Sequence, residues 1–160
     1  LIIKFFSKKS METDQQSSNQ TYGSKALDKI VTRLQATDDH KKRYEYVLWL
    51  AKKLPPLPKE FHTEGLKVKG CISQVYVLGK MSEGKLYWKG SSDALITKGL
   101  LSLLIQGLDD LTPEEILRID PSFIAATGLN SSLTPSRANG FLNILLNMQA
   151  QAQRIKMESI

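Results

Sequence analysis

The sequence predicts an α+β fold in which helices pack against a three-stranded antiparallel sheet. Two observations carry this prediction. The spacing of apolar residues changes from a helical repeat to alternation near residue 66, and it returns to a helical repeat after residue 90. The chain is interrupted by prolines before the first change and by a glycine at the second change, so each kind of element ends before the next begins. One central group of strands flanked by helices is typical of an α+β fold.

Two amphipathic helices are predicted before the strands. Residues 24–36 carry apolar side chains three and four positions apart, and residues 40–54 repeat this pattern. The polar residues 37–39 break the chain between the two helices and supply the second N-cap. Three prolines between residues 55 and 58 then end the second helix and impose an extended segment.

Three strands are predicted next. Residues 66–69 alternate between apolar and charged side chains, and residues 75–78 and 85–89 are rich in β-branched and aromatic side chains. A turn at residues 82–84 joins the last two segments into a hairpin, so the three form an antiparallel meander.

Four helices are predicted after Gly90. The first covers residues 94–105 and is apolar on nearly every side, so we expect it to be central. Ser91 or Ser92 is its expected N-cap, and Asp93 is expected in its first turn, where the helix dipole favours a carboxylate.

The other three helices are predicted from proline just inside a capping residue. Thr112-Pro113 opens a helix that ends at Arg118, and Asp120-Pro121 opens one that Gly128 closes. Thr134-Pro135 opens the last helix, whose polar end from residue 149 onward is expected to fray. Its expected inward side chains are Phe141, Leu142, Leu145, Leu146 and Met148.

Length and composition indicate one globular domain. The chain has 160 residues, of which 41% are hydrophobic and 24% charged. We place the domain at residues 23–153, after a polar N-terminal tail (residues 1–22) predicted to be disordered and before a frayed end (residues 154–160). No stretch has the length of a transmembrane helix.

Cys71 is the only cysteine, which excludes an intramolecular disulfide. It follows Gly70, which allows a sharp turn, and Lys67 and Lys69 lie just upstream. Nearby cations lower the pKa of a thiol and so favour the nucleophilic thiolate. The alternative for this stretch is a small buried apolar side chain, which is the commoner role of a free cysteine. The two histidines lie far apart, so neither a zinc site nor a Cys-His protease is indicated.

Three further residues are candidates for a role at the site. Asp93 is either a helix-capping carboxylate or a pocket residue that controls the thiol. Arg137 is a cation on the first turn of the last helix, where it opposes the helix dipole, so a carboxylate or other anion is its expected partner. Gly140 costs that helix about 1 kcal/mol relative to alanine, which predicts close packing against another backbone.

The net charge of +6 leads to a second hypothesis, a basic RNA-binding accessory domain. Tyr76, Tyr87 and Trp88 in the predicted sheet would supply stacking surfaces. Against it, the lysines are interleaved with acidic residues, and the aromatic residues match no RNA-recognition motif.

Four stretches resemble the SufE-like family of sulfur-acceptor proteins. They are residues 70–75 (GCISQV), residues 92–100 (SDALITKGL), Gly128-Leu129 with residues 133–135 (LTP), and residues 136–140 (SRANG). Their order and spacing make the resemblance specific, and it covers about residues 25 to 150. Family members often have tryptophan where this chain has Tyr76.

The resemblance implies that Cys71 accepts a sulfane sulfur from a pyridoxal-phosphate-dependent cysteine desulfurase of the SufS or CsdA type. The chain would stimulate that enzyme, carry the sulfur as a persulfide and pass it to an iron–sulfur cluster scaffold. It would not itself be an enzyme, and no cofactor, metal or membrane is expected. The matching positions implied to support Cys71 or bind the partner are Gly70, Ser73, Gln74, Asp93, Arg137 and Asn139.

The resemblance also implies a fold like that of the IscU-type cluster scaffold. A monomer or homodimer is expected, located in the cytoplasm of a bacterium or the plastid stroma of a phototrophic eukaryote.

Overall fold

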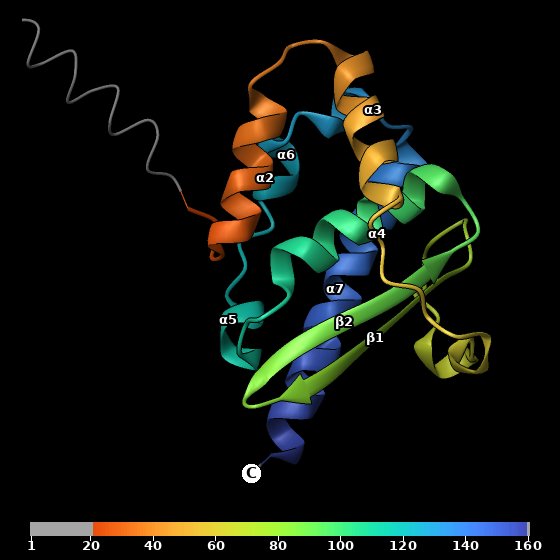
Figure 1. Ribbon diagram of the computed structural model, residues 1–160, viewed down its shortest axis with the longest axis vertical. Helices are drawn as coiled ribbons and strands as arrows, with labels where there is room; N and C mark the ends of the chain where they lie inside the picture. The colour runs from red at the N-terminus through yellow and green to blue at the C-terminus, as the bar shows by residue number, and fades with distance from the viewer. Residues whose placement is uncertain (1–20, 160) are drawn as a thin grey trace, which may run out of the picture.

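A computed structural model describes residues 21–159 and confirms the α+β architecture, with helices packed on one antiparallel hairpin (Figure 1). The helices are α2 (Lys25–Gln35), α3 (His40–Ala51), α4 (Leu95–Leu108), α5 (Pro113–Leu117), α6 (Phe123–Ala126) and α7 (Pro135–Glu158). The strands are β1 (Val75–Ser82) and β2 (Lys85–Ser92), and the single-turn 3₁₀ helices are η1 (Lys59–Phe61), η2 (Glu64–Leu66) and η3 (Leu129–Ser131).

The helix boundaries follow the capping residues of the sequence. Ser24 and Asp39 accept backbone hydrogen bonds at the starts of α2 and α3. Thr112 forms the predicted capping box with Glu115. Thr134 caps α7, with proline at its first position. Gly128 adopts a left-handed conformation directly after α6 and its C-cap, as expected for the glycine that closes this helix.

The predicted third strand is wrong, because the sheet found in residues 21–159 has only two strands. Leu66 lies in η2 instead, and Lys67 forms a single antiparallel bridge with Tyr76. The Val68 amide then donates to the Val75 carbonyl at 2.8 Å, and the chain turns away at Gly70. One bridge does not make a strand. Residues 67–69 therefore form a short irregular segment along β1, which we call the tether.

Both edges of the hairpin are covered by other parts of the chain. The buried Gln151 side chain of α7 accepts a hydrogen bond from the Gly79 amide (3.1 Å) and donates one to the Val77 carbonyl (2.9 Å). Along β2, Leu86 exchanges backbone hydrogen bonds with Asp110 and Leu111 after α4. These contacts occupy backbone groups that an open edge would leave free for another strand.

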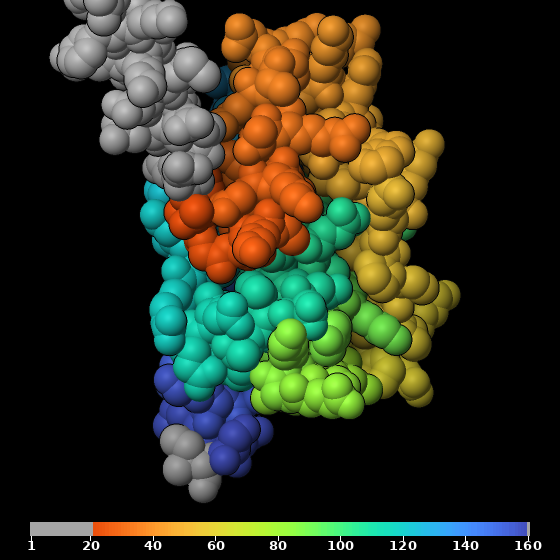
Figure 2. All heavy atoms as spheres, turned by 60° about the vertical axis from the view of Figure 1, so that its left-hand side comes forward, coloured from red at the N-terminus to blue at the C-terminus, as the bar shows by residue number. Residues whose placement is uncertain are grey.

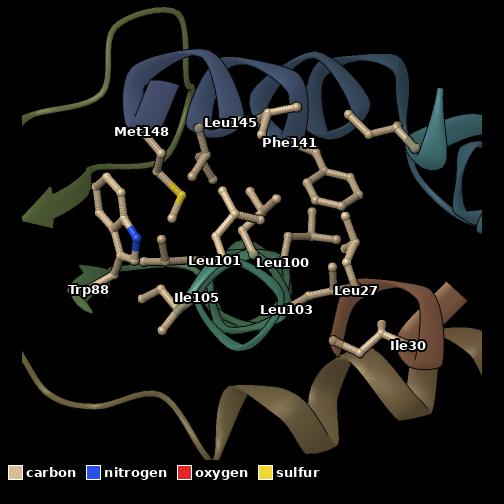
Figure 3. Close-up of a cluster of buried hydrophobic side chains, with 14 of the residues drawn as sticks. Leu27, Ile30, Trp88, Leu100, Leu101, Leu103, Ile105, Phe141, Leu145 and Met148 are labelled. Carbon is tan, nitrogen blue, oxygen red and sulfur yellow. The ribbon is translucent and has the colours of Figure 1, made fainter. Parts of the chain in front are cut away.

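The core is built around α4, as its apolar sequence predicts. This helix packs against α2, α3, α7 and β2. Figure 3 shows Phe141, Leu145 and Met148 of α7 directed toward Leu100 and Leu101 of α4, with Trp88 of β2 at one side. A Cβ atom at Gly99 would overlap the carbonyl oxygen of Val47, so α3 and α4 meet backbone to backbone.

The inward face of α7 differs from the prediction at two positions. Phe141, Leu145 and Met148 are fully buried as expected, but Leu142 is 37% exposed and Leu146 is 48% exposed. These two leucines each lie one residue beyond the buried stripe, about 100° around the helix.

The ends of the described chain are more ordered than predicted. The helix α7 continues to Glu158, and Gln151 and Ala152 are buried, so residues 149–158 do not fray. Tyr22, assigned above to the disordered tail, is buried and packs edge-on against Phe123. The rest of that tail, residues 1–20, lies outside the described residues. Figure 2 shows α2, α5 and the hairpin side by side on one face, with the end of α7 below them.

Candidate functional site

A short loop, residues 70–74, carries Cys71 from the tether to the start of β1. Gly70 has a positive φ of 81°, and a Cβ atom there would lie 2.5 Å from the Asn143 side-chain nitrogen. That nitrogen donates a 3.0 Å hydrogen bond to the Gly70 carbonyl. Only glycine fits this turn, and α7 anchors the loop through Asn143.

The Cys71 thiol faces the first turns of α7. It is half-buried, packs against the core, and its Sγ lies 3.6 Å from the Gly140 carbonyl oxygen, to which the thiol can donate. Burial raises the pKa of the Cys71 thiol. The prediction that Lys67 and Lys69 lower this pKa is wrong, because burial raises it and neither lysine contributes a lowering. The thiol is therefore protonated at neutral pH in this conformation.

A hollow of about 360 Å³ opens beside the Cys71 sulfur. It lies between the loop, the start of α4 and the start of α7. Its lining includes hydroxyl groups, the Arg137 side chain and the bare backbone of Gly140. A Cβ atom at Gly140 would lie 3.5 Å from the Cys71 sulfur. Gly140 therefore faces the thiol. The close packing of another backbone predicted there is wrong, because the Cys71 side-chain sulfur is the neighbour that such a Cβ atom would meet.

Asp93 supports the loop rather than opening α4. That helix begins at Leu95, with Ala94 as N-cap, and Ser91 and Ser92 belong to β2. The Asp93 carboxylate accepts a hydrogen bond from the Gln74 backbone N–H at 2.9 Å. The Asp93 backbone N–H donates to the Gln74 backbone carbonyl at 3.3 Å. The hairpin therefore extends by one residue pair, Gln74 and Asp93, beyond its two strands. This pairing fixes the end of the cysteine loop.

The remaining predicted site residues lie around the hollow or near it. Ser73 forms a 3.3 Å hydroxyl–hydroxyl hydrogen bond with the buried Thr97 of α4. Arg137 and Asn139 are exposed on the first turns of α7. Arg137 lines the hollow but forms no salt bridge with Asp93, since the one ion pair found within residues 21–159 joins Lys85 and Asp110.

Sequence reasoning missed three residues of the site. Thr97 lines the hollow, Asn143 holds Gly70, and Ile72 is 85% exposed next to the thiol. Of these three residues, only Ile72 gave a signal in the sequence. It is an apolar residue directly after the cysteine, and no predicted element placed it in the core. Thr97 and Asn143 lie far along the chain, and only the fold brings them to the loop.

The aromatic residues proposed for RNA binding do not form a stacking surface. Trp88 is 2% exposed and belongs to the core, and the Tyr76 ring stacks on His62 with the ring centroids 4.8 Å apart. Only Tyr87 is exposed. The RNA-binding hypothesis therefore loses its stacking surface, one of the two observations on which it rested.

The described residues contain no group of three or more His, Cys, Asp or Glu side chains arranged to hold a metal ion. Nor does any helix among them have the length and apolar character needed to cross a membrane. What the site offers chemically is one half-buried thiol beside a hollow with a cation and a helix N-terminus.

Comparison with known proteins identifies the family. An uncharacterized SufE-like protein from Synechocystis is 55% identical over 126 residues, which cover 79% of each chain. The cysteine desulfuration protein SufE from Plasmodium vivax is 45% identical over 130 residues, 78% of this chain but only 51% of that protein. A solution structure of a hypothetical protein from Thermus thermophilus superposes with a TM-score of 0.71 at 27% identity, covering 82% of this chain and 96% of the other. The family model described as "SufE: Fe-S metabolism associated domain" matches residues 28–152, and the chain therefore belongs to the SufE family.

Proposed function

We propose that this chain is a sulfur carrier whose Cys71 accepts the outer sulfur of a cysteine desulfurase persulfide and delivers it for iron–sulfur cluster assembly. One observation carries the proposal: the single thiol is held half-buried and protonated at the edge of a 360 Å³ hollow, neither sealed in the core nor left open to solvent. Membership of the family and the name of the Plasmodium relative support it.

The transfer is an exchange that leaves the oxidation state of the moving sulfur unchanged. The Cys71 thiol loses its proton to solvent, and its thiolate attacks the outer sulfur of the donor Cys–S–SH group. A bond forms between Cys71 Sγ and that sulfur, while the bond to the donor cysteine breaks and releases the donor thiolate. Onward transfer repeats the exchange with an acceptor thiolate, so no resolving cysteine is needed.

The hollow is suited to hold the added sulfur. Gly140 leaves space next to Cys71 Sγ, because it presents backbone and no side chain. The added sulfur is anionic when deprotonated. The N-terminus of the 24-residue helix α7 and the exposed Arg137 guanidinium are both favourable neighbours for that charge. Arg137 is also free to meet an acidic group of the desulfurase, since Asp93 does not occupy it.

The half-buried state protects the thiol between encounters. Oxidation requires an accessible thiolate, and burial disfavours both exposure and ionisation. Docking on the desulfurase must therefore turn the loop outward and ionise Cys71. The desulfurase holds the pyridoxal phosphate and does the carbon–sulfur chemistry, and this chain raises its turnover by removing the product sulfur. The compartment is that of the desulfurase, bacterial cytoplasm or plastid stroma.

The test is desulfurase turnover with Cys71→Ser. A serine hydroxyl is nearly the same size as the thiol but is not nucleophilic at neutral pH, so stimulation should be lost while the fold is kept. Alanine release from cysteine is measured with wild type, with Cys71→Ser and without carrier. Full stimulation by the variant would remove Cys71 from the mechanism, and a lowered melting temperature would point to a structural role.

A further inference from the structure

A groove distinct from the hollow runs from the Cys71 loop along α7. Its two parts, of about 300 and 450 Å³, share Glu64, Lys67 and Lys69 as walls. The first part reaches Cys71, and the second reaches Leu146 and Arg154 of α7. We call it the basic groove, defined by Glu64, Lys67, Lys69, Leu146 and Arg154. We propose that the basic groove docks an acidic segment of the sulfur-donating desulfurase, a step that rests on the proposed function.

The charge of the groove calls for an acidic occupant. Three cations, Lys67, Lys69 and Arg154, stand against one carboxylate, Glu64. Lys69 and Arg154 are exposed, and none of the three cations forms a salt bridge within residues 21–159. Cations that pair with no residue in the described part of the chain remain available to a partner. Carboxylates brought beside them would be attracted at long range and would speed the encounter.

The groove also offers an apolar contact. Leu146 is 48% exposed on the α7 wall, although its neighbour Leu145 is fully buried. A leucine flanked by unpaired cations matches a segment with one apolar side chain between acidic residues. Apolar burial would add affinity, while the charges would set register and association rate.

The position of the groove identifies the occupant as the donor of sulfur. The groove ends at Cys71, so whatever fills it lies next to the cysteine loop. Asn143 belongs to the same wall and holds the Gly70 carbonyl. A segment that competes for Asn143 would release the loop at the moment when the donor is in place. The resting thiol needs that release before it can ionise, whereas a loaded persulfide is already acidic.

The experiment uses the full chain, the desulfurase and cysteine. The variant Lys69→Glu/Arg154→Glu reverses two exposed groove charges. The control Lys52→Glu/Lys89→Glu makes the same change in net charge at exposed lysines outside the groove. Initial rates of sulfur loading are measured against carrier concentration at low and moderate salt. Loading by a small inorganic polysulfide, which needs no docking, is measured in parallel.

The groove variant should raise the KM for carrier by about tenfold at low salt and reduce the salt dependence, because steering is lost. Loading by polysulfide should be unchanged, and the control should stay within about twofold of wild type. The neutral variant Lys69→Gln/Arg154→Gln should give a smaller change in the same direction, and it replaces the reversal if that variant unfolds.

Two results would overturn the groove while leaving the carrier function intact. One is that neither groove variant slows sulfur loading more than the control variant does. The other is normal loading with impaired transfer from the loaded carrier to a scaffold, which would make the occupant the acceptor. If wild type takes no sulfur from desulfurase or polysulfide, the carrier function fails and the groove proposal fails with it.

Discussion

Gly140 makes a direct test of the space next to the thiol. An alanine methyl at this position would lie 3.5 Å from the Cys71 sulfur, an ordinary van der Waals contact. Gly140→Ala therefore needs no rearrangement, while Gly140→Val extends further into the space where the transferred sulfur would attach. The two variants fill the hollow in steps and leave Cys71 itself unchanged.

The expected stability change comes from the helix. Replacing glycine by alanine inside a helix stabilises it by about 0.8–1 kcal/mol, and no clash offsets this gain. For a domain of this size, about 1 kcal/mol raises the melting temperature by roughly 2–4 °C. Gly140→Val should gain less, because β-branched residues lose side-chain freedom in a helix.

The assay pairs thermal unfolding with sulfur loading by the desulfurase. We expect Gly140→Ala to be more stable than wild type and slower to load, and Gly140→Val to load slower by about tenfold or more, as small misplacements of reacting atoms commonly cost. Ala26→Val is the control, because Ala26 is exposed on α2, away from the hollow and from the basic groove.

Either of two results would refute this reasoning. A melting temperature lowered by Gly140→Ala would mean that the space facing the sulfur is absent. Loading at the wild-type rate by both variants would mean that the added sulfur does not occupy the hollow.

Three further variants test the loop, the pH response and the partner contact. Asn143→Ala removes the hydrogen bond to Gly70, so it should cost about 1 kcal/mol and speed alkylation of Cys71 by maleimide; unchanged alkylation would mean that this bond does not hold the loop. Burial raises the pKa of Asp109 from 3.8 to about 6, so this carboxyl binds more protons in the folded state between these values and contributes a loss of stability as pH rises from 4 to 6. Asp109→Asn should abolish that loss, which is on the order of 1 kcal/mol once partial exposure is discounted. Denaturant unfolding at pH 4 and pH 7 measures it, and a variant with the same difference in unfolding free energy between the two pH values as wild type would show that the reasoning is wrong. Arg137→Ala should leave the melting temperature unchanged and raise the KM for carrier with the desulfurase, because its side chain is exposed and forms no salt bridge; a large fall in melting temperature would contradict its exposed position.

The helices were predictable because their signals are local. The capping box at Thr112 and Glu115, and proline at the first turn of α7, are read within four residues. The central position of α4 followed from its composition alone, since a helix that is apolar all round must be buried on all sides.

The prediction of a third strand was wrong because the pairing of this segment depends on residues that are distant in sequence. Residues 66–69 have the alternation of a strand, but Gln151 of α7 takes the backbone groups on β1 that a longer strand would pair with. Gly70 then turns the chain toward Asn143. Neither residue is near the segment in sequence, so alternation alone could not show that pairing stops after one bridge.

Of the site, the sequence indicated the residues but not their arrangement. Cys71 and Gly140 are 69 residues apart, and their contact follows from the packing of α7. The sign of the Cys71 pKa shift was missed, because adjacent lysines are visible in sequence and burial is not. Asp93 was assigned to a helix start because a serine-serine-aspartate run resembles a cap, whereas the hairpin extends through it.

The central claim is that Cys71 carries sulfur, and intact mass tests it most directly. The chain is incubated with the desulfurase and cysteine, and its mass is recorded without reducing agent. We predict a gain of about 32 Da, one sulfur per chain, that maps to the peptide containing Cys71 and is absent after prior alkylation or in Cys71→Ser. An unchanged mass, while the desulfurase turns over cysteine in the same tube, would contradict the account.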